Sequence, residues 1–184
     1  MAAILCYVSY APVWLIGHLG LSELMFSGLF GFNAVFNIVA CFTAPLVIRK
    51  LGNRPTTILA LSILVLSAAI TVAGQQFGPS TGMMAAFAFM LPMLMLGVGF
   101  SFLLGPATSM ALSAFGERAG TAAAMLGFIQ MSGASVLAGL VQQTNLTAPY
   151  AVALVMGVFP IGLLLMMALS RFDHWHQEQL AGEH

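Results

Sequence analysis

Amide side chains within long apolar stretches are the residues of this sequence best suited to binding chemistry. Asn33 and Asn37 lie four residues apart in one stretch, and Gln130 lies in the middle of another. Residues four apart share one face of a helix. An unpaired amide in hydrocarbon is unfavourable, so each of these side chains needs either a partner or a watery cavity. The pattern therefore predicts either a cavity wall that hydrogen-bonds a solute or hydrogen bonding between helices.

Aromatic and thioether side chains accompany these amides. Tyr7 and Tyr10 belong to the first apolar stretch, and Met93 lies in the methionine-rich run FMLPMLML. Thioethers adapt to ligands of different shape, although core packing is the alternative role of such methionines. Apolar walls with a few hydrogen-bonding groups suit amphipathic solutes. The predicted substrate-binding residues are Tyr7, Tyr10, Asn33, Asn37, Met93 and Gln130.

Catalytic and metal-binding clusters are not predicted. His18 ends the first apolar stretch, the other histidines lie in the C-terminal tail, and no Asp or Glu lies in the middle of a stretch. A membrane-embedded protease needs an activated nucleophile or a zinc set at membrane depth. The tail segment Asp173 to His176 contains two histidines, but their alternation alone does not define a coordination geometry. We therefore predict no enzymatic activity, no metal and no cofactor.

Composition places the chain in a membrane. Its 184 residues are 60% hydrophobic and 5% charged, with a mean hydropathy of +1.01. A soluble domain carries about 25% charged residues. Five basic and five acidic residues give no net charge, which excludes nucleic acid as a main partner. The predicted fold class is an all-α polytopic membrane protein whose surroundings are the lipid bilayer.

Polar breaks divide the chain into six apolar stretches, each predicted to be a transmembrane helix. A bilayer core of roughly 30 Å needs about 20 helical residues, and the first stretch is short by that measure. The predicted spans are residues 2–17, 26–48, 56–73, 83–110, 121–141 and 150–169. Residues 1–170 would thus form one six-helix bundle, and residues 171–184 a polar tail.

Basic residues predict the orientation of these spans. Arg49, Lys50 and Arg54 follow the second span, Arg118 follows the fourth and Arg171 follows the sixth. Cytoplasmic loops collect Lys and Arg. Because the number of spans is even, both termini are predicted to be cytoplasmic.

Several motifs carry a family resemblance. One stretch, YVSYAPVWLIGHLGLSELMFSGLFGFNAVFNIV, covers the first two spans, and a second, GPATSMALSAFGERAGTAAAMLGFIQMSGASVLAGLV, covers the fourth and fifth. The most specific pieces are AGTA at 119–122, YVSYAP at 7–12 and FGFN at 30–33. Together they resemble the C-terminal half of a Major Facilitator Superfamily transporter, in particular the Bcr/CflA-type (EmrD-like) drug/proton antiporters. The loop PLVIRKLGNRP resembles a degenerate copy of that superfamily's cytoplasmic motif, with Arg49 in place of an Asp and a tight turn at Gly52.

This resemblance implies a multidrug efflux function in a bacterial inner (plasma) membrane. Spans one, two, four and five would line a central cavity, and spans three and six would lie outside it. Such transporters exchange amphipathic or drug-like solutes for protons by alternating access, with two six-helix halves rocking against each other. Proton coupling needs a titratable group in the pathway, whereas Glu23, near an outer break, is interpreted as a helix cap or a solvated loop residue. We therefore expect the chain to be a C-terminal half, with the proton-carrying residue in an N-terminal half.

Two other interpretations remain open. A self-sufficient six-helix transporter would act as a homodimer, joined through the small residues of the fifth span. These small residues are Ala119, Ala123, Gly127, Ala134 and Ala138. A non-transporting membrane subunit would bind no solute and would contact a cytoplasmic partner through residues 171–184.

Overall fold

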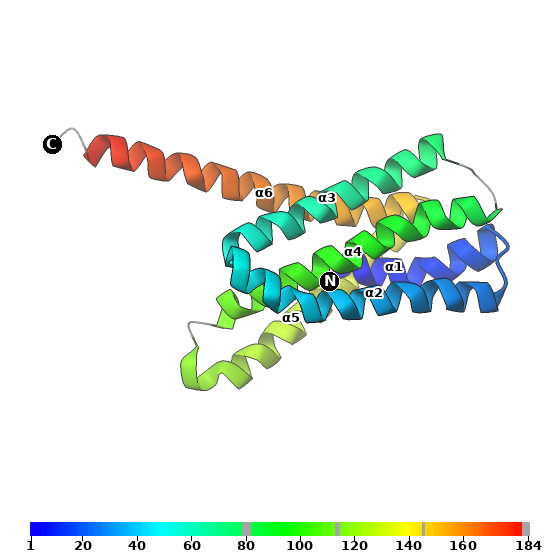
Figure 1. Ribbon diagram of the computed structural model, residues 1–184, viewed down its shortest axis with the longest axis horizontal. Coiled ribbons are helices and arrows are strands. Elements are labelled where there is room, and N and C mark those ends of the chain that lie inside the picture. Colours follow the sequence, from blue (N-terminus) through cyan, green and yellow to red (C-terminus); the bar gives the residue numbers. More distant parts are fainter. Residues whose placement is uncertain (79–81, 113–114, 145, 182–184) are drawn as a thin grey trace.

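The computed structural model describes residues 1–78, 82–112, 115–144 and 146–181, without the side chains of residues 109, 110, 117 and 170–181. Every regular element in these ranges is a helix (Figure 1), which confirms the predicted all-α fold class. The elements are α1 (Ala2–Pro12), the π-helix η1 (Val13–His18), α2 (Glu23–Leu51), α3 (Asn53–Phe77), α4 (Gly82–Leu112), the 3-10 helix η2 (Gly116–Arg118), α5 (Ala119–Gln142) and α6 (Ala148–Ala181).

The helices have the lengths and hydropathies of membrane spans. Within the described ranges, α2, α3, α4, α5 and the Ala148–Leu169 part of α6 are long and apolar enough to cross a bilayer. A shorter apolar helix, Ala2–His18, combines α1 and η1. The chain is therefore a multi-pass membrane protein.

Local sequence signals set the helix boundaries. The Ser22 hydroxyl accepts a hydrogen bond from the Met25 backbone N–H at 3.3 Å, which caps the start of α2. Gly52 separates α2 from α3 with φ 85° and ψ 169°, a conformation almost confined to glycine. This confirms the predicted tight turn. Pro12 has no backbone N–H to donate, and the chain changes from α-helix to π-helix directly after it.

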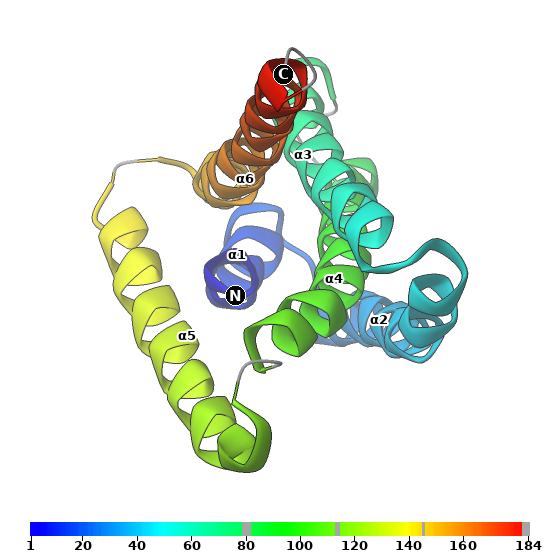
Figure 2. The ribbon, with the colours of Figure 1, turned by 90° about the vertical axis from the view of Figure 1, so that its left-hand side faces the viewer.

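Helix α1 lies in the middle of the bundle, with α5 on one side and α2 on the other (Figure 2). The extensive contacts join α3 to α4, α3 to α6, α2 to α4, α1 to α5 and α1 to α6. If α1 is exchanged with α4, α2 with α5 and α3 with α6, the same five pairs result. A triplet of spans crosses the membrane an odd number of times, so the two triplets would have opposite orientations. These five pairs thus follow the pattern of an inverted internal repeat, whereas the contacts between α2 and α3 have no counterpart of equal extent between α5 and α6.

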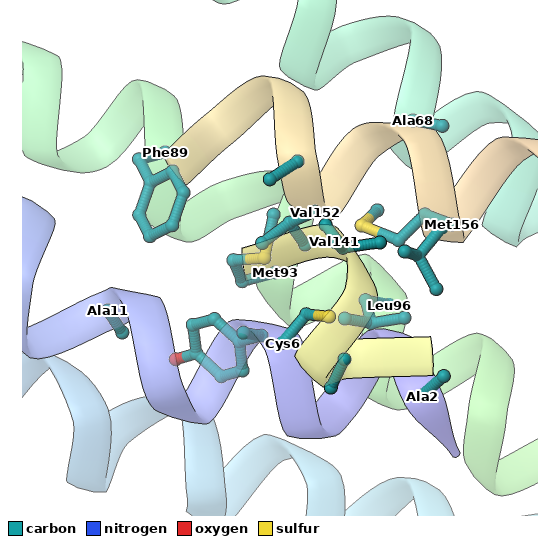
Figure 3. Close-up of a cluster of buried hydrophobic side chains, with 14 of the residues drawn as sticks. Ala2, Cys6, Ala11, Ala68, Phe89, Met93, Leu96, Val141, Val152 and Met156 are labelled. Carbon is teal, nitrogen blue, oxygen red and sulfur yellow. The ribbon is translucent and has the colours of Figure 1, made fainter. Parts of the chain in front are cut away.

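The buried core lies between α1, α4 and α6. Cys6, Met93 and Val152 point into it from these helices (Figure 3). Helix α5 joins this core through Ala134 and Ala138, which are both buried. Close approach of helices through such small residues is typical of membrane proteins. The small-residue face of α5 is nevertheless divided, because Ala123 is exposed.

Candidate functional site

A chain of hydrogen bonds connects α2 to α1 and α4 at mid-helix. The Asn37 Nδ2 atom donates to the backbone carbonyl of Asn33 at 3.1 Å and to its Oδ1 at 2.9 Å. The Asn33 Nδ2 atom donates to the Tyr7 hydroxyl at 3.4 Å, and that hydroxyl donates to the Met90 sulfur at 3.8 Å. We call Asn37, Asn33, Tyr7 and Met90 the polar ladder. It joins three helices through neutral groups only.

The polar ladder ends in an unused acceptor. The Asn37 Oδ1 atom is buried and has no hydrogen-bond partner among the described residues. It lies against Gly97 of α4, at the position that a Cβ atom on residue 97 would occupy. Glycine has no Cβ atom and therefore leaves room for this oxygen. A contact between the oxygen and the Cα hydrogens of Gly97 is only a weak substitute for a hydrogen bond. The Asn37 amide must turn away from Gly97 before this oxygen can accept a hydrogen bond from a solute, because the atom is buried in this position.

A cavity of about 330 Å³ opens beside the polar ladder, between α1, α2 and α4. This volume falls in the range of small-molecule sites. We call it the first cavity. The side chains on its wall are mostly apolar, with hydroxyl, amide and thiol groups among them. Its lining residues are Ile4, Tyr7, Val8, Phe30, Asn33, Ala34, Asn37, Cys41, Met93, Leu96, Gly97, Phe100 and Ser101.

The walls of the first cavity are held by further contacts. The Tyr7 ring stacks on Phe30 with centroids 5.7 Å apart and planes 18° apart. The Cys41 thiol donates to the Ser101 hydroxyl oxygen at 3.3 Å, and that hydroxyl donates to the Gly97 carbonyl at 2.9 Å. None of the described lining residues is charged. In a medium of low dielectric constant, such a wall favours neutral or weakly polar solutes with aromatic surface.

The other predicted binding residues lie in different places. Met93 lines the first cavity and is buried in the core. Gln130 is half-buried and lines a second cavity of about 370 Å³. Tyr10 is half-buried against the core and lines neither of these two cavities. The structure therefore brings Tyr7, Asn33, Asn37 and Met93 together and keeps Tyr10 and Gln130 apart from them.

Sequence reasoning did not identify several lining residues. Phe30 and Phe100 add aromatic surface, Cys41 and Ser101 add polar groups, and Gly97 receives the Asn37 side chain. The closely spaced glycines in the α4 segment LGVGF are the one local signal of this approach. Phe30 and Phe100 carried no such signal, because the chain contains 14 phenylalanines and nothing local distinguishes these two.

Side chains that could bind a metal ion do not cluster among the described residues. Among the described residues, no group of three or more His, Cys, Asp or Glu side chains is placed to hold a metal ion. The tail segment Asp173 to His176 lies outside the residues whose side chains are described. Glu23 is the first residue of α2, next to the Ser22 cap, and is exposed.

Comparison with known proteins gives one consistent group of relatives. No family model and no solved structure matches the chain. The Multidrug resistance protein MdtL of Shewanella oneidensis is 24% identical over 175 residues, which is 94% of this chain and 43% of that protein. The protein of the same name from Klebsiella pneumoniae is 26% identical over 181 residues, and that from Vibrio parahaemolyticus 24% over 181 residues, each covering 97% of this chain and 44% of the relative. Nearly the whole chain is thus similar to a segment that makes up less than half the length of each of these proteins, which are named for multidrug resistance.

Proposed function

We propose that this chain forms the C-terminal half of a Major Facilitator Superfamily transporter of the Bcr/CflA type. In this proposal it exports amphipathic, drug-like solutes across a bacterial inner membrane in exchange for protons, by alternating access. The observation that carries the proposal is the first cavity, with its uncharged polar ladder and apolar walls between α1, α2 and α4. Similarity to the MdtL proteins over 43–44% of their length supports a half-sized unit.

Each lining side chain has a role in this proposal. Tyr7, Asn33 and Asn37 hydrogen-bond the polar end of the solute, and for this the Asn37 amide turns its unpaired Oδ1 from Gly97 toward the first cavity. Phe30 and Met93 contact its apolar part. Thioether and aromatic groups tolerate varied shapes, which suits a site that accepts many compounds.

Proton coupling is assigned to a residue outside this chain. The sequence has five acidic residues, and all of them lie in breaks or in the tail. A proton carrier needs a titratable group within the transport pathway. The amides of the first cavity cannot take that role, because they do not titrate.

Solute binding tests the first part of the proposal. The chain is placed in lipid nanodiscs and titrated with N-ethyl dansylamide, whose fluorescence rises in an apolar site. We expect saturable binding that weakens about fivefold or more in Asn37→Leu, since a hydrogen bond to a buried amide is worth about 1 kcal/mol or more. Thr43→Val is the matched control, because the Thr43 hydroxyl donates to the Ala40 carbonyl of the same helix and does not line the first cavity. Equal affinities in all three proteins, or no saturable binding, would refute the site.

Transport tests the proposed half-sized role. In a chimera, this chain replaces the matched segment of the Klebsiella pneumoniae relative, and efflux of a fluorescent amphipathic solute is followed in proteoliposomes with a pH gradient. We expect efflux by the chimera and none by the chain alone, with loss of efflux in the Asn37→Leu chimera. If the chain alone catalyses efflux and light scattering shows that it is a dimer, the self-sufficient homodimeric transporter would be established instead.

A further inference from the structure

The second cavity has a composition different from the first. It extends between α1, α3, α4, α5 and α6, and Gln130 contributes the one polar side chain among its described lining residues. Its remaining walls are aliphatic, aromatic and thioether groups. It therefore suits a hydrocarbon segment and offers almost nothing to a hydrogen-bonding group.

Three residues belong to the walls of both cavities. Ile4 of α1 and Leu96 and Phe100 of α4 line the first cavity and the second cavity alike. The two spaces therefore share part of their walls. Phe100 is half-buried, and its side chain, which has two rotatable torsions, belongs to this shared wall.

The second cavity has an exposed, apolar rim. Ile129 of α5 is 62% exposed and Phe159 of α6 is 51% exposed, and both line this cavity. Contacts between α5 and α6 are sparse among the described residues. This apolar rim offers a hydrocarbon chain a way into the second cavity.

We propose that the two cavities form one two-part site for elongated amphipathic molecules, with a hydrogen-bonding head in the first cavity and an alkyl tail in the second. This inference rests on the proposed function, and it specifies its substrate class. The Asn37 Oδ1 atom, once turned from Gly97 toward the first cavity, accepts a hydrogen bond from the head, while the tail passes Phe100 and ends among the apolar walls of the second cavity. Affinity should therefore depend on tail length and on the free volume of the second cavity.

Gly133 offers a way to fill the second cavity without disturbing the backbone. It lines this cavity, and a Cβ atom added to it would meet no heavy atom within 4 Å. The substitution Gly133→Leu therefore adds side-chain volume at the wall of the second cavity, with no clash at the Cβ atom. Gly127→Leu is the matched control on the same helix, because a Cβ there also meets nothing within 4 Å and Gly127 lines neither cavity.

The experiment measures the affinity of N-alkyl dansylamides with tails of two to ten carbons for the chain in nanodiscs. For each probe we take the ratio of the dissociation constants of Gly133→Leu and wild type. Partitioning of the probe into lipid is the same for both proteins and cancels in this ratio. We expect a ratio near one for the two-carbon tail and about tenfold for the eight-carbon tail, since each buried methylene contributes severalfold in affinity. Gly127→Leu should match wild type at every length.

Different failures of this experiment have different meanings. A ratio that stays near one at every tail length, with saturable binding of the two-carbon probe, overturns the two-part site and leaves the first cavity as proposed. Absence of saturable binding for every probe overturns the proposed function as well. A second variant, Phe100→Ala, enlarges the passage between the cavities and should tighten binding of the eight-carbon probe more than that of the two-carbon probe. An equal effect on both probes also contradicts the inference.

Discussion

Replacing Gly97 by alanine should disrupt the polar ladder through a single steric conflict. A Cβ atom on residue 97 would coincide with the side-chain amide of Asn37. Asn37 must then leave this position or α4 must move away from α2. Displacement of Asn37 also breaks its hydrogen bonds to the Asn33 carbonyl and to Asn33 Oδ1, which are 3.1 and 2.9 Å long.

The size of this effect follows from three contributions. Overpacking a core costs about 1–3 kcal/mol. The two hydrogen bonds are worth about 0.6 kcal/mol each in a membrane protein. Alanine in place of a helical glycine returns about 1 kcal/mol through helix propensity. Gly97→Ala should therefore lower the free energy of unfolding by about 1–3 kcal/mol.

A double-mutant cycle isolates the contact between Gly97 and Asn37. Unfolding is followed by circular dichroism during titration of detergent micelles with sodium dodecyl sulfate. In an Asn37→Ala background the obstacle is absent, so Gly97→Ala should be neutral or stabilising, with a coupling energy of at least about 1 kcal/mol. Gly99→Ala is the control, because a Cβ there meets Leu64 and the Ala60 carbonyl of α3 and not Asn37. Equal destabilisation by Gly97→Ala in both backgrounds would refute the reasoning.

Three further predictions concern other parts of the bundle. The buried Ser67 hydroxyl of α3 donates to the Pro92 carbonyl of α4, so Ser67→Ala should lower the same free energy of unfolding by about 1 kcal/mol, and a change of zero would show that the bond contributes nothing. Gly52→Ala should lower it by about 1–3 kcal/mol, since φ 85° with ψ 169° strains any other residue, and an unchanged midpoint would contradict this. Cys41 is exposed and lines the first cavity, whereas Cys6 is fully buried, so N-ethylmaleimide should label Cys41 first by mass spectrometry, and bound N-ethyl dansylamide should slow that labelling. Preferential labelling of Cys6 would contradict the burial of Cys6 and the exposure of Cys41.

The sequence predicted the fold class because hydropathy is a local property. Apolar runs separated by polar breaks require helices in a bilayer, where every backbone amide needs an internal partner. The tight turn at Gly52 was expected from the resemblance of the loop PLVIRKLGNRP to a superfamily motif. Asn33 and Asn37 could be assigned to one helix face from their spacing alone.

Partners of these polar residues could not be predicted from the sequence. Nothing in the spacing of Asn37 indicates that it meets Gly97, which is far along the chain, or that Tyr7 bonds Asn33. Gln130 had the same local signature as the asparagines, and the fold places it on a different cavity.

Sequence alone thus determined which segments are apolar helices and which of their residues are polar. The tertiary structure decided which of those residues share a cavity, where its free acceptor lies and how it adjoins a second, apolar space. The physical reason is that lipid is as apolar as a leucine-rich helix, so hydrophobicity does not select helix neighbours in a membrane. Neighbours are selected by close packing of small residues and by interhelical hydrogen bonds, and both depend on contacts between residues distant in the chain.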